Sequence, residues 1–139
     1  MPDPFRTSRL VEFHDTDMAG IMHFASFFVY MESAEHELLR SLGLSVHQAV
    51  GGEAVSFPRV SASCQYLAPA RCEETLDIEV AVGRIGDKSV TYDIHFRRGD
   101  REIAVGQTTC VCCRVKPGGQ LVSQSLPAEI VEKLTRFLK

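Results

Sequence analysis

Two carboxylates, a glycine and a histidine lie close together in the segment His14-Asp-Thr-Asp-Met-Ala-Gly-Ile-Met-His23. A helical pattern begins directly after this segment, so these side chains are expected beside the free N–H groups and positive dipole end of a helix. In such a place a carboxylate could attack a carbonyl carbon or activate a water molecule, while backbone N–H groups stabilise the oxyanion that forms. The segment is therefore the first candidate for a reactive site.

The same residue types have a second interpretation, in which Asp15 and Asp17 only shape the turn. Aspartate commonly accepts hydrogen bonds from nearby backbone N–H groups, and spacing alone favours this structural role. His23 is equally open, because it could bind substrate or water or could simply pack at the start of the helix. The spacing of these residues leaves both alternatives in place.

Motifs typical of other catalytic or binding sites are missing from the sequence. The chain has no G-x-S-x-G nucleophile elbow, no glycine-rich nucleotide-binding loop, no H-E-x-x-H and no pair of C-x-x-C motifs. Its five histidines are not spaced like metal ligands. We therefore expect no metal site and no bound cofactor.

A long helix is predicted to follow the candidate loop. Apolar residues recur at spacings of three and four and form one face, with most charged residues on the other side. The apolar face consists of Phe24, Phe27, Phe28, Met31, Ala34, Leu38 and Leu42. The polar side is assigned Glu32, Glu35, Glu37 and Arg40. Gly43 should end the helix as a C-terminal cap, with Leu44 making the apolar contact that accompanies such a cap.

Strands are predicted on both sides of this helix. A short strand runs from Arg6 to Phe13. Three later runs, over 60–66, 76–82 and 90–96, alternate apolar and polar residues as half-buried antiparallel strands do. The apolar phase changes at Pro58-Arg59, which indicates a bulge or kink there.

A last strand and a terminal helix complete the predicted order. The run from Ile103 to Val115 has apolar residues on one side and small, weakly polar ones on the other, so we expect burial on both faces. A short amphipathic helix is predicted between Ser125 and Lys139. One long helix against an antiparallel sheet of about five strands is an α+β fold. The length suits a single domain over 1–139.

The composition is that of an ordinary globular protein with a small negative charge. Fifteen basic and eighteen acidic residues give a formal net charge of −3, so no basic surface points to nucleic acid. We find neither a secretory signal nor an apolar run long enough to cross a bilayer, and we expect a cytoplasmic protein without a membrane span. The five cysteines, an odd number with two adjacent, favour reduced structural thiols over disulfides.

The candidate loop and helix together resemble a known family. The segment from Phe13 to Phe27, with Glu32, Leu39-Arg40 and Gly43 after it, is similar to the signature of the hotdog-fold acyl-CoA thioesterases, in the 4-hydroxybenzoyl-CoA thioesterase-like branch. Further matches are Tyr66-Leu-Ala-Pro-Ala-Arg71, Leu76-Asp-Ile-Glu79 and Lys88-Ser89. The resemblance implies a hotdog fold, in which a five-stranded antiparallel sheet wraps around one long helix. It also implies dimers that often associate into tetramers, with active sites at the dimer interface.

The resemblance assigns catalytic roles within the loop. It implies that the carboxylate of Asp17 is the catalytic group and that the backbone N–H of Phe24 binds the oxyanion, with Asp15 as a supporting turn residue. His23 and Phe24 stand where family members usually have an aromatic pair, or a tyrosine followed by histidine. A backbone donor tolerates this change, but the side-chain roles stay open, and His23 is kept as a further candidate for the catalytic machinery.

The resemblance also implies a binding site for a coenzyme A thioester. Substrate contacts are assigned to Gly20 and Phe57, with Arg59 and Lys88 as candidates to hold the coenzyme phosphates at an exposed rim. Further candidate cations are Arg71 and Arg84. The expected function is hydrolysis of an acyl- or aryl-CoA by a homo-oligomer. Two alternatives remain: a hydrolase of acyl carrier protein thioesters, and a non-catalytic acyl-CoA-binding module, against which the combination of Asp17 with Gly20 argues.

Overall fold

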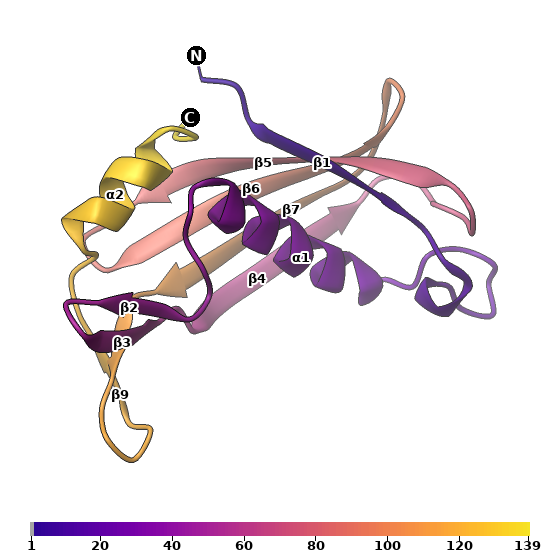
Figure 1. Cartoon of the computed structure of the whole chain (residues 1–139). Coiled ribbons are helices and arrows are strands. Elements are labelled where there is room, and N and C mark those ends of the chain that lie inside the picture. The colour runs from indigo at the N-terminus through magenta and orange to yellow at the C-terminus, as the bar shows by residue number, and fades with distance from the viewer. Residues whose placement is uncertain (1) are drawn as a thin grey trace.

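The structure, a computed structural model that describes residues 2–139, is built on a five-stranded sheet (Figure 1). Its strands are β1 (Phe5–Leu10), β4 (Arg59–Tyr66), β5 (Thr75–Ile85), β6 (Ser89–Arg98) and β7 (Arg101–Val111). They pair antiparallel in the order β1-β5-β6-β7-β4, so β1 and β4 are the two edges. The pairing of β4 with β7 shifts register between Arg59 and Ser61, which confirms the irregularity predicted near Pro58.

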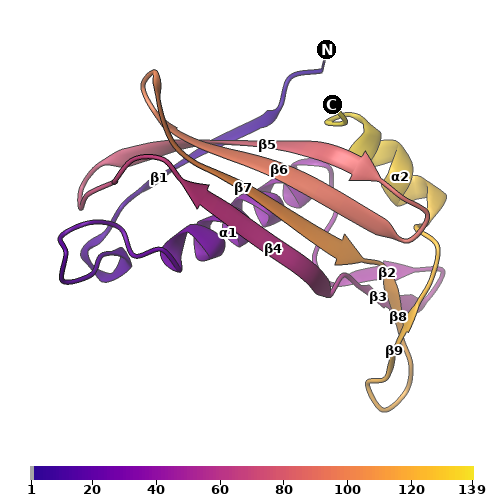
Figure 2. The ribbon, with the colours of Figure 1, turned by 180° about the vertical axis from the view of Figure 1, so that it is seen from behind.

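Helix α1 (Ser26–Ser41) lies across one face of this sheet, and the opposite face is open in the reverse view (Figures 1 and 2). Helix and sheet approach closely at β7, where a Cβ atom on Gly106 would overlap the sulfur of Met31. The predicted glycine cap is confirmed, because Gly43 has a φ of 76° and the Leu44 N–H donates to the Leu39 carbonyl at 2.8 Å.

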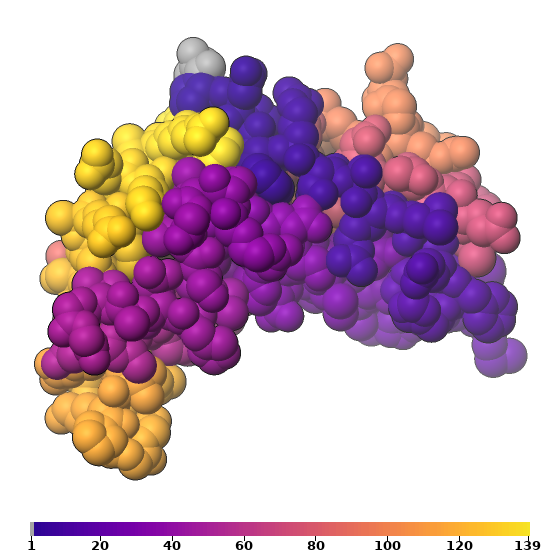
Figure 3. All heavy atoms as spheres, in the orientation of Figure 1, coloured from indigo at the N-terminus to yellow at the C-terminus, as the bar shows by residue number. Residues whose placement is uncertain are grey.

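A second, smaller sheet stands at one end of the molecule and was not predicted. It contains β2 (Gln48–Val50), β3 (Glu53–Ser56), β8 (Cys113–Val115) and β9 (Leu121–Ser123), in the order β2-β3-β8-β9. The hairpin of β8 and β9 projects from the body (Figure 3). Helix α2 (Ala128–Thr135) lies within the segment predicted as the terminal helix. Within residues 2–139, neither helix is long and apolar enough to cross a membrane.

Alternation of apolar and polar residues correctly predicted which side chains of the interior strands β5 and β6 are buried. It predicted burial poorly for the edge strand β4. The inward residues of β5 and β6 are buried as expected: Leu76, Ile78, Val80, Val82, Val90, Tyr92, Ile94 and Phe96. On β4, Val60 is 61% exposed and Ala62 and Tyr66 are also exposed. An edge strand has a paired neighbour on one side only, so its apolar positions receive less cover.

The last predicted strand differs from the structure in two ways. It divides at Cys112 into β7 and β8, which belong to different sheets. The predicted burial on both faces is also wrong for β7: Val105, Thr109 and Val111 are only partly buried, whereas the face of small side chains is buried because those residues leave room for α1. Those residues are Ala104, Gly106, Thr108 and Cys110. Burial raises the pKa of the Cys110 thiol to about 12, so this thiol stays protonated.

Three boundaries or faces near the candidate loop also need correction. The first strand ends at Leu10 rather than Phe13, because residues Phe13–Asp15 form a turn of 3₁₀ helix. Phe24 precedes α1 and is 63% exposed, so it is not part of the buried helix face. Glu35, assigned to the polar side, is buried, and Arg59 from β4 pairs with its carboxylate.

Candidate active site

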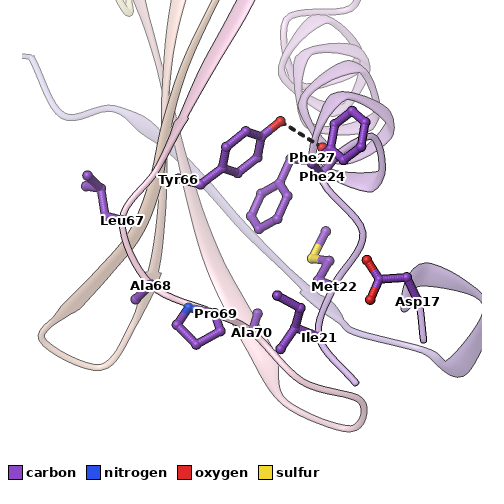
Figure 4. Close-up of a pocket in the computed structure, with 10 residues that line it drawn as sticks. All are labelled: Asp17, Ile21, Met22, Phe24, Phe27, Tyr66, Leu67, Ala68, Pro69 and Ala70. Atoms are coloured by element: carbon purple, nitrogen blue, oxygen red, sulfur yellow. Dashed lines mark hydrogen bonds between the residues drawn. The ribbon is translucent and has the colours of Figure 1, made fainter. Parts of the chain in front are cut away.

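An open pocket of about 500 Å³ lies between the loop before α1 and the segment that follows β4 (Figure 4). Its lining comes from these two segments, from the end of β4 and from the first turn of the helix. The residues are Asp17, Ile21, Met22, Phe24, Phe27, Tyr66, Leu67, Ala68, Pro69 and Ala70. Most of these side chains are apolar, and Asp17 is the ionisable carboxylate among them. The two residues with assigned catalytic roles, Asp17 and Phe24, therefore share one pocket.

Asp15 holds this loop in shape from inside the protein. Its Oδ2 atom accepts hydrogen bonds from the Glu12 N–H at 2.9 Å and from the Tyr30 hydroxyl at 2.6 Å. Its backbone carbonyl accepts from the His23 N–H at 2.8 Å and from the Ser26 hydroxyl at 3.0 Å. These four bonds fasten both ends of the loop to each other and to α1. Asp15 thus has the contacts expected of a supporting turn residue.

Asp17 is exposed, and its carboxylate is only partly occupied by the turn. Oδ1 accepts the Ala19 N–H at 2.9 Å, and Gly20 permits the turn by taking a φ of 78°. Within residues 2–139, the other carboxylate oxygen has no hydrogen-bond donor. Asp17 therefore forms the local turn and still presents an oxygen that can act as a nucleophile or as a base.

The residues just before α1 are arranged around His23 and Phe24. His23 Nδ1 accepts the Ala25 N–H at 3.0 Å, and the His23 ring stacks on that of Phe24 at 4.5 Å. This arrangement suits a residue that packs at the helix start. The Phe24 N–H donates to no acceptor within the described residues 2–139. It is thus available to an oxygen atom of a ligand.

An aromatic wall closes one side of the pocket. The rings of Phe27 and Tyr66 meet edge to face at 5.2 Å, and Phe27 meets Phe96 in the same way at 5.3 Å. Phe27 and Phe96 are buried, so this wall is anchored in the core. The Tyr66 hydroxyl donates to the Phe24 carbonyl at 2.9 Å (Figure 4).

The other predicted binding residues lie away from this pocket in a single chain. Arg59 and Lys88 belong to the end of the sheet where β4 and β6 pair with Cys110 and Val111, whereas Tyr66 pairs with Ala104 at the other end. The eight residues of β4 span roughly 25 Å. Lys88 is exposed in the turn between β5 and β6. Within one chain, the loop with Asp17 and these cations are not brought together.

Arg59 and Phe57 have surroundings that the sequence did not indicate. The Arg59 guanidinium forms two hydrogen bonds with the buried Glu35 carboxylate, at 2.5 and 3.0 Å, and these bonds raise the pKa of Arg59. Arg59 is therefore half-buried and paired rather than free at an exposed rim. Phe57 lines a small internal cavity of about 20 Å³ beside Tyr92. Phosphate binding by Arg59 and substrate contact by Phe57 stay predictions.

Sequence reasoning missed three contacts that connect predicted site residues to the fold. Tyr30 supports Asp15, Tyr66 bonds to Phe24, and Glu35 pairs with Arg59. Each of these contacts joins residues at least 15 positions apart. The signal in the sequence that could have indicated such a contact was a polar group within an apolar helix face, such as the hydroxyl of Tyr30.

Potential metal ligands occur in one part of the loop. Among the described residues 2–139, ligating atoms of Glu12, His14 and Asp15 lie within 4.8 Å of one another. Asp15 already accepts two hydrogen bonds on Oδ2, and the side chains of Glu12 and His14 are exposed. These contacts account for Asp15 without a metal ion. A site without metal stays the prediction.

Comparison with known proteins finds one matching family model and several similar proteins. The family model described as the thioesterase-like superfamily matches residues 11–136. A 1,4-dihydroxy-2-naphthoyl-CoA hydrolase from Thermosynechococcus vestitus is 29% identical over 82% of this chain and 80% of its own. The acyl-CoA thioester hydrolase YbgC from Escherichia coli is 28% identical, with 91% and 92% covered. A solved 1,4-dihydroxy-2-naphthoyl-CoA thioesterase from Synechocystis has a TM-score of 0.83 at 25% identity, with 94% and 95% covered.

Proposed function

The chain belongs to the thioesterase-like superfamily of hotdog-fold thioester hydrolases, and on this premise we propose that it hydrolyses an acyl- or aryl-CoA with Asp17 as the catalytic carboxylate. The observation that carries the proposal is the shared pocket of Asp17 and Phe24. One offers a carboxylate oxygen and the other a backbone N–H, neither of which has a partner within residues 2–139. A thioester carbonyl needs these two groups, one to attack or activate and one to stabilise the oxyanion.

Two chemical routes use the same carboxylate. In the nucleophilic route, the Asp17 carboxylate attacks the carbonyl carbon, the C–S bond breaks, coenzyme A leaves as a thiolate, and water hydrolyses the resulting mixed anhydride. In the general-base route, Asp17 removes a proton from water, which attacks the carbonyl carbon, and the proton finally reaches the departing thiolate. A thiol ionises with a pKa of about 8.5, so neither route needs a strong general acid. The Phe24 N–H serves as the oxyanion donor in both.

We propose that the complete site forms between two copies of the chain. Strand β4 is an edge of the main sheet and carries the exposed side chain of Val60, so it can pair antiparallel with β4 of a second copy. That pairing would bring the start of one β4, with Phe57 and Arg59, next to Tyr66 at the end of the other. It would thus explain how residues at opposite ends of one sheet could serve a single substrate.

Binding of the coenzyme is assigned to residues around this shared site. Gly20 shapes the turn at Asp17 and leaves the backbone open to the substrate, since nothing lies within 4 Å of where its Cβ would be. Lys88 is exposed and can attract a phosphate from solvent. Arg59 carries a positive charge that Glu35 already balances, so Lys88 is the better candidate of the two. The named relatives that hydrolyse CoA thioesters support a CoA substrate over an acyl carrier protein.

A panel of thioesters tests the proposed function directly. The purified chain is incubated with acetyl-, octanoyl-, palmitoyl- and benzoyl-CoA and with an octanoyl acyl carrier protein, and the loss of the thioester absorbance is followed. We expect at least one CoA thioester to be hydrolysed with a kcat/KM on the order of 10⁴ M⁻¹s⁻¹ or higher. Hydrolysis of the carrier-protein thioester alone would favour that alternative. Tight binding of acyl-CoA without hydrolysis of any member would favour a binding module and contradict the proposal.

A further inference from the structure

Tyr66 connects the end of an edge strand to the residue proposed to bind the oxyanion. It is the last residue of β4, and its hydroxyl donates to the Phe24 carbonyl at 2.9 Å across 42 positions of sequence (Figure 4). Partial loss of solvent around the hydroxyl, with a smaller effect of Cys64, raises the pKa of Tyr66, so the hydroxyl keeps its proton at neutral pH. Tyr66 is thus a hydrogen-bond donor under ordinary assay conditions.

The Phe24 carbonyl accepts its hydrogen bond from Tyr66 because it receives none from the N–H groups of the helix. Helix α1 begins at Ser26, and the Phe28 N–H, which one more helical turn would direct to Phe24, donates instead to the Ala25 carbonyl at 3.1 Å. Phe24 is also 63% exposed, so packing restrains it weakly. His23 and Ala25 are fixed by their own hydrogen bonds on either side. Among residues 2–139, the bond from Tyr66 is the hydrogen bond that restrains the backbone of Phe24 itself.

We propose that Tyr66 is a positioning residue, whose hydroxyl fixes the Phe24 backbone so that the Phe24 N–H can receive the oxyanion. The inference rests on the proposed function. It adds a residue from β4 to a site whose other groups come from the loop and the start of α1. Because the ring of Tyr66 also lines the pocket against Phe27, the hydroxyl and the ring have separable roles. Loss of the hydroxyl alone should affect stabilisation of the transition state more than binding of the substrate.

Tyr66→Phe separates these roles, because it removes the hydroxyl and keeps the ring. With the best CoA thioester of the panel, we expect kcat to fall on the order of 10-fold, while KM changes by less than about twofold, since small displacements of catalytic groups mainly reduce the rate of the chemical step. Tyr92→Phe is the matched control, because Tyr92 is buried on β6 away from the pocket. It should keep the wild-type kcat.

The outcomes distinguish this inference from the function on which it rests. An active wild type with an unchanged kcat in Tyr66→Phe would overturn the positioning role and leave the proposed function standing. A rise in KM without a fall in kcat, or an equal fall in kcat in Tyr92→Phe, would also overturn it. A wild type that hydrolyses no thioester would overturn the proposed function and, with it, the role of Tyr66. A lower kcat in Tyr66→Phe alone, at an unchanged melting temperature, supports the inference.

Discussion

Asp15 and Asp17 are two positions apart, yet the structure gives their carboxylates opposite surroundings. Asp15 is buried and accepts hydrogen bonds from the Glu12 N–H and the Tyr30 hydroxyl. Asp17 is exposed in the pocket and keeps one oxygen available. Burial and multiple bonds suit a group that holds the loop, whereas exposure with a free oxygen suits a group that meets substrate.

We expect Asp15→Asn to lower the free energy of unfolding by about 1–3 kcal/mol, because a charged acceptor of two hydrogen bonds is replaced in a buried place. Denaturant-induced unfolding measures this change. Asp17→Asn is the matched control and should stay within about 0.5 kcal/mol of wild type, since Asp17 is exposed. If Asp15→Asn unfolds at the same denaturant concentration as wild type, Asp15 does not hold the loop.

Sequence reasoning located this loop, but the spacing of its residues could not distinguish the roles of its two aspartates. Both fit a turn, and their different roles came from the resemblance to a family. The residue that distinguishes them is Tyr30, which lies 15 positions beyond Asp15 on a buried face of α1. Its bond to Asp15 exists only once the helix has docked against the loop, so no local pattern could reveal it.

At the scale of elements, the Glu35–Arg59 pair joins the middle of α1 to the start of β4. Arg59→Met leaves the buried Glu35 carboxylate without its charged partner, with the Thr108 hydroxyl at 3.4 Å as its remaining donor, so we expect the free energy of unfolding to fall by about 3–5 kcal/mol. Combining Arg59→Met with Glu35→Leu should recover most of this loss, because an apolar pair needs no hydrogen bond. Urea unfolding of the two variants measures both effects. An Arg59→Met variant as stable as wild type would show that the pair does not stabilise the contact between α1 and β4.

The success of sequence reasoning for each element depended on its length and neighbours. Strands β5 and β6 are long and lie between other strands, so a simple alternation of burial holds along them. Strand β4 lies at an edge, and β7 packs beneath α1 through its small residues. For these two strands, the pattern of hydrophobic residues therefore did not predict which side chains are buried. The smaller sheet consists of strands of three or four residues, which are too short to carry a periodic pattern.

At the scale of the whole molecule, exposed apolar side chains follow β4 and the segments beside it. They include Phe24, Val60, Tyr66 and Leu67, each at least 45% exposed in one chain. Several exposed apolar side chains beside a free strand edge are typical of an interface between subunits. We therefore predict a dimer or a tetramer in solution.

Light scattering after size-exclusion chromatography tests this prediction by measuring the mass of the protein in solution. Wild type should have at least twice the 15.4 kDa mass of one chain, and Val60→Lys should shift it toward the monomer by placing a charge on the β4 edge. Leu121→Lys, which charges an exposed apolar residue of β9, is the matched control and should keep the wild-type mass. A monomeric wild type at micromolar concentration would contradict a site shared between two copies.

The central claim is that Asp17 is the catalytic carboxylate, and the turnover number of Asp17→Asn tests it most directly. The amide keeps the size of the side chain and can still accept the Ala19 N–H, but it can neither attack the carbonyl carbon nor remove a proton from water. With Asp77→Asn, an exposed aspartate of β5, as the matched control, kcat for the best CoA thioester should fall by about 10²–10⁴-fold in Asp17→Asn alone. A folded Asp17→Asn protein that hydrolyses the thioester as fast as wild type would contradict the account.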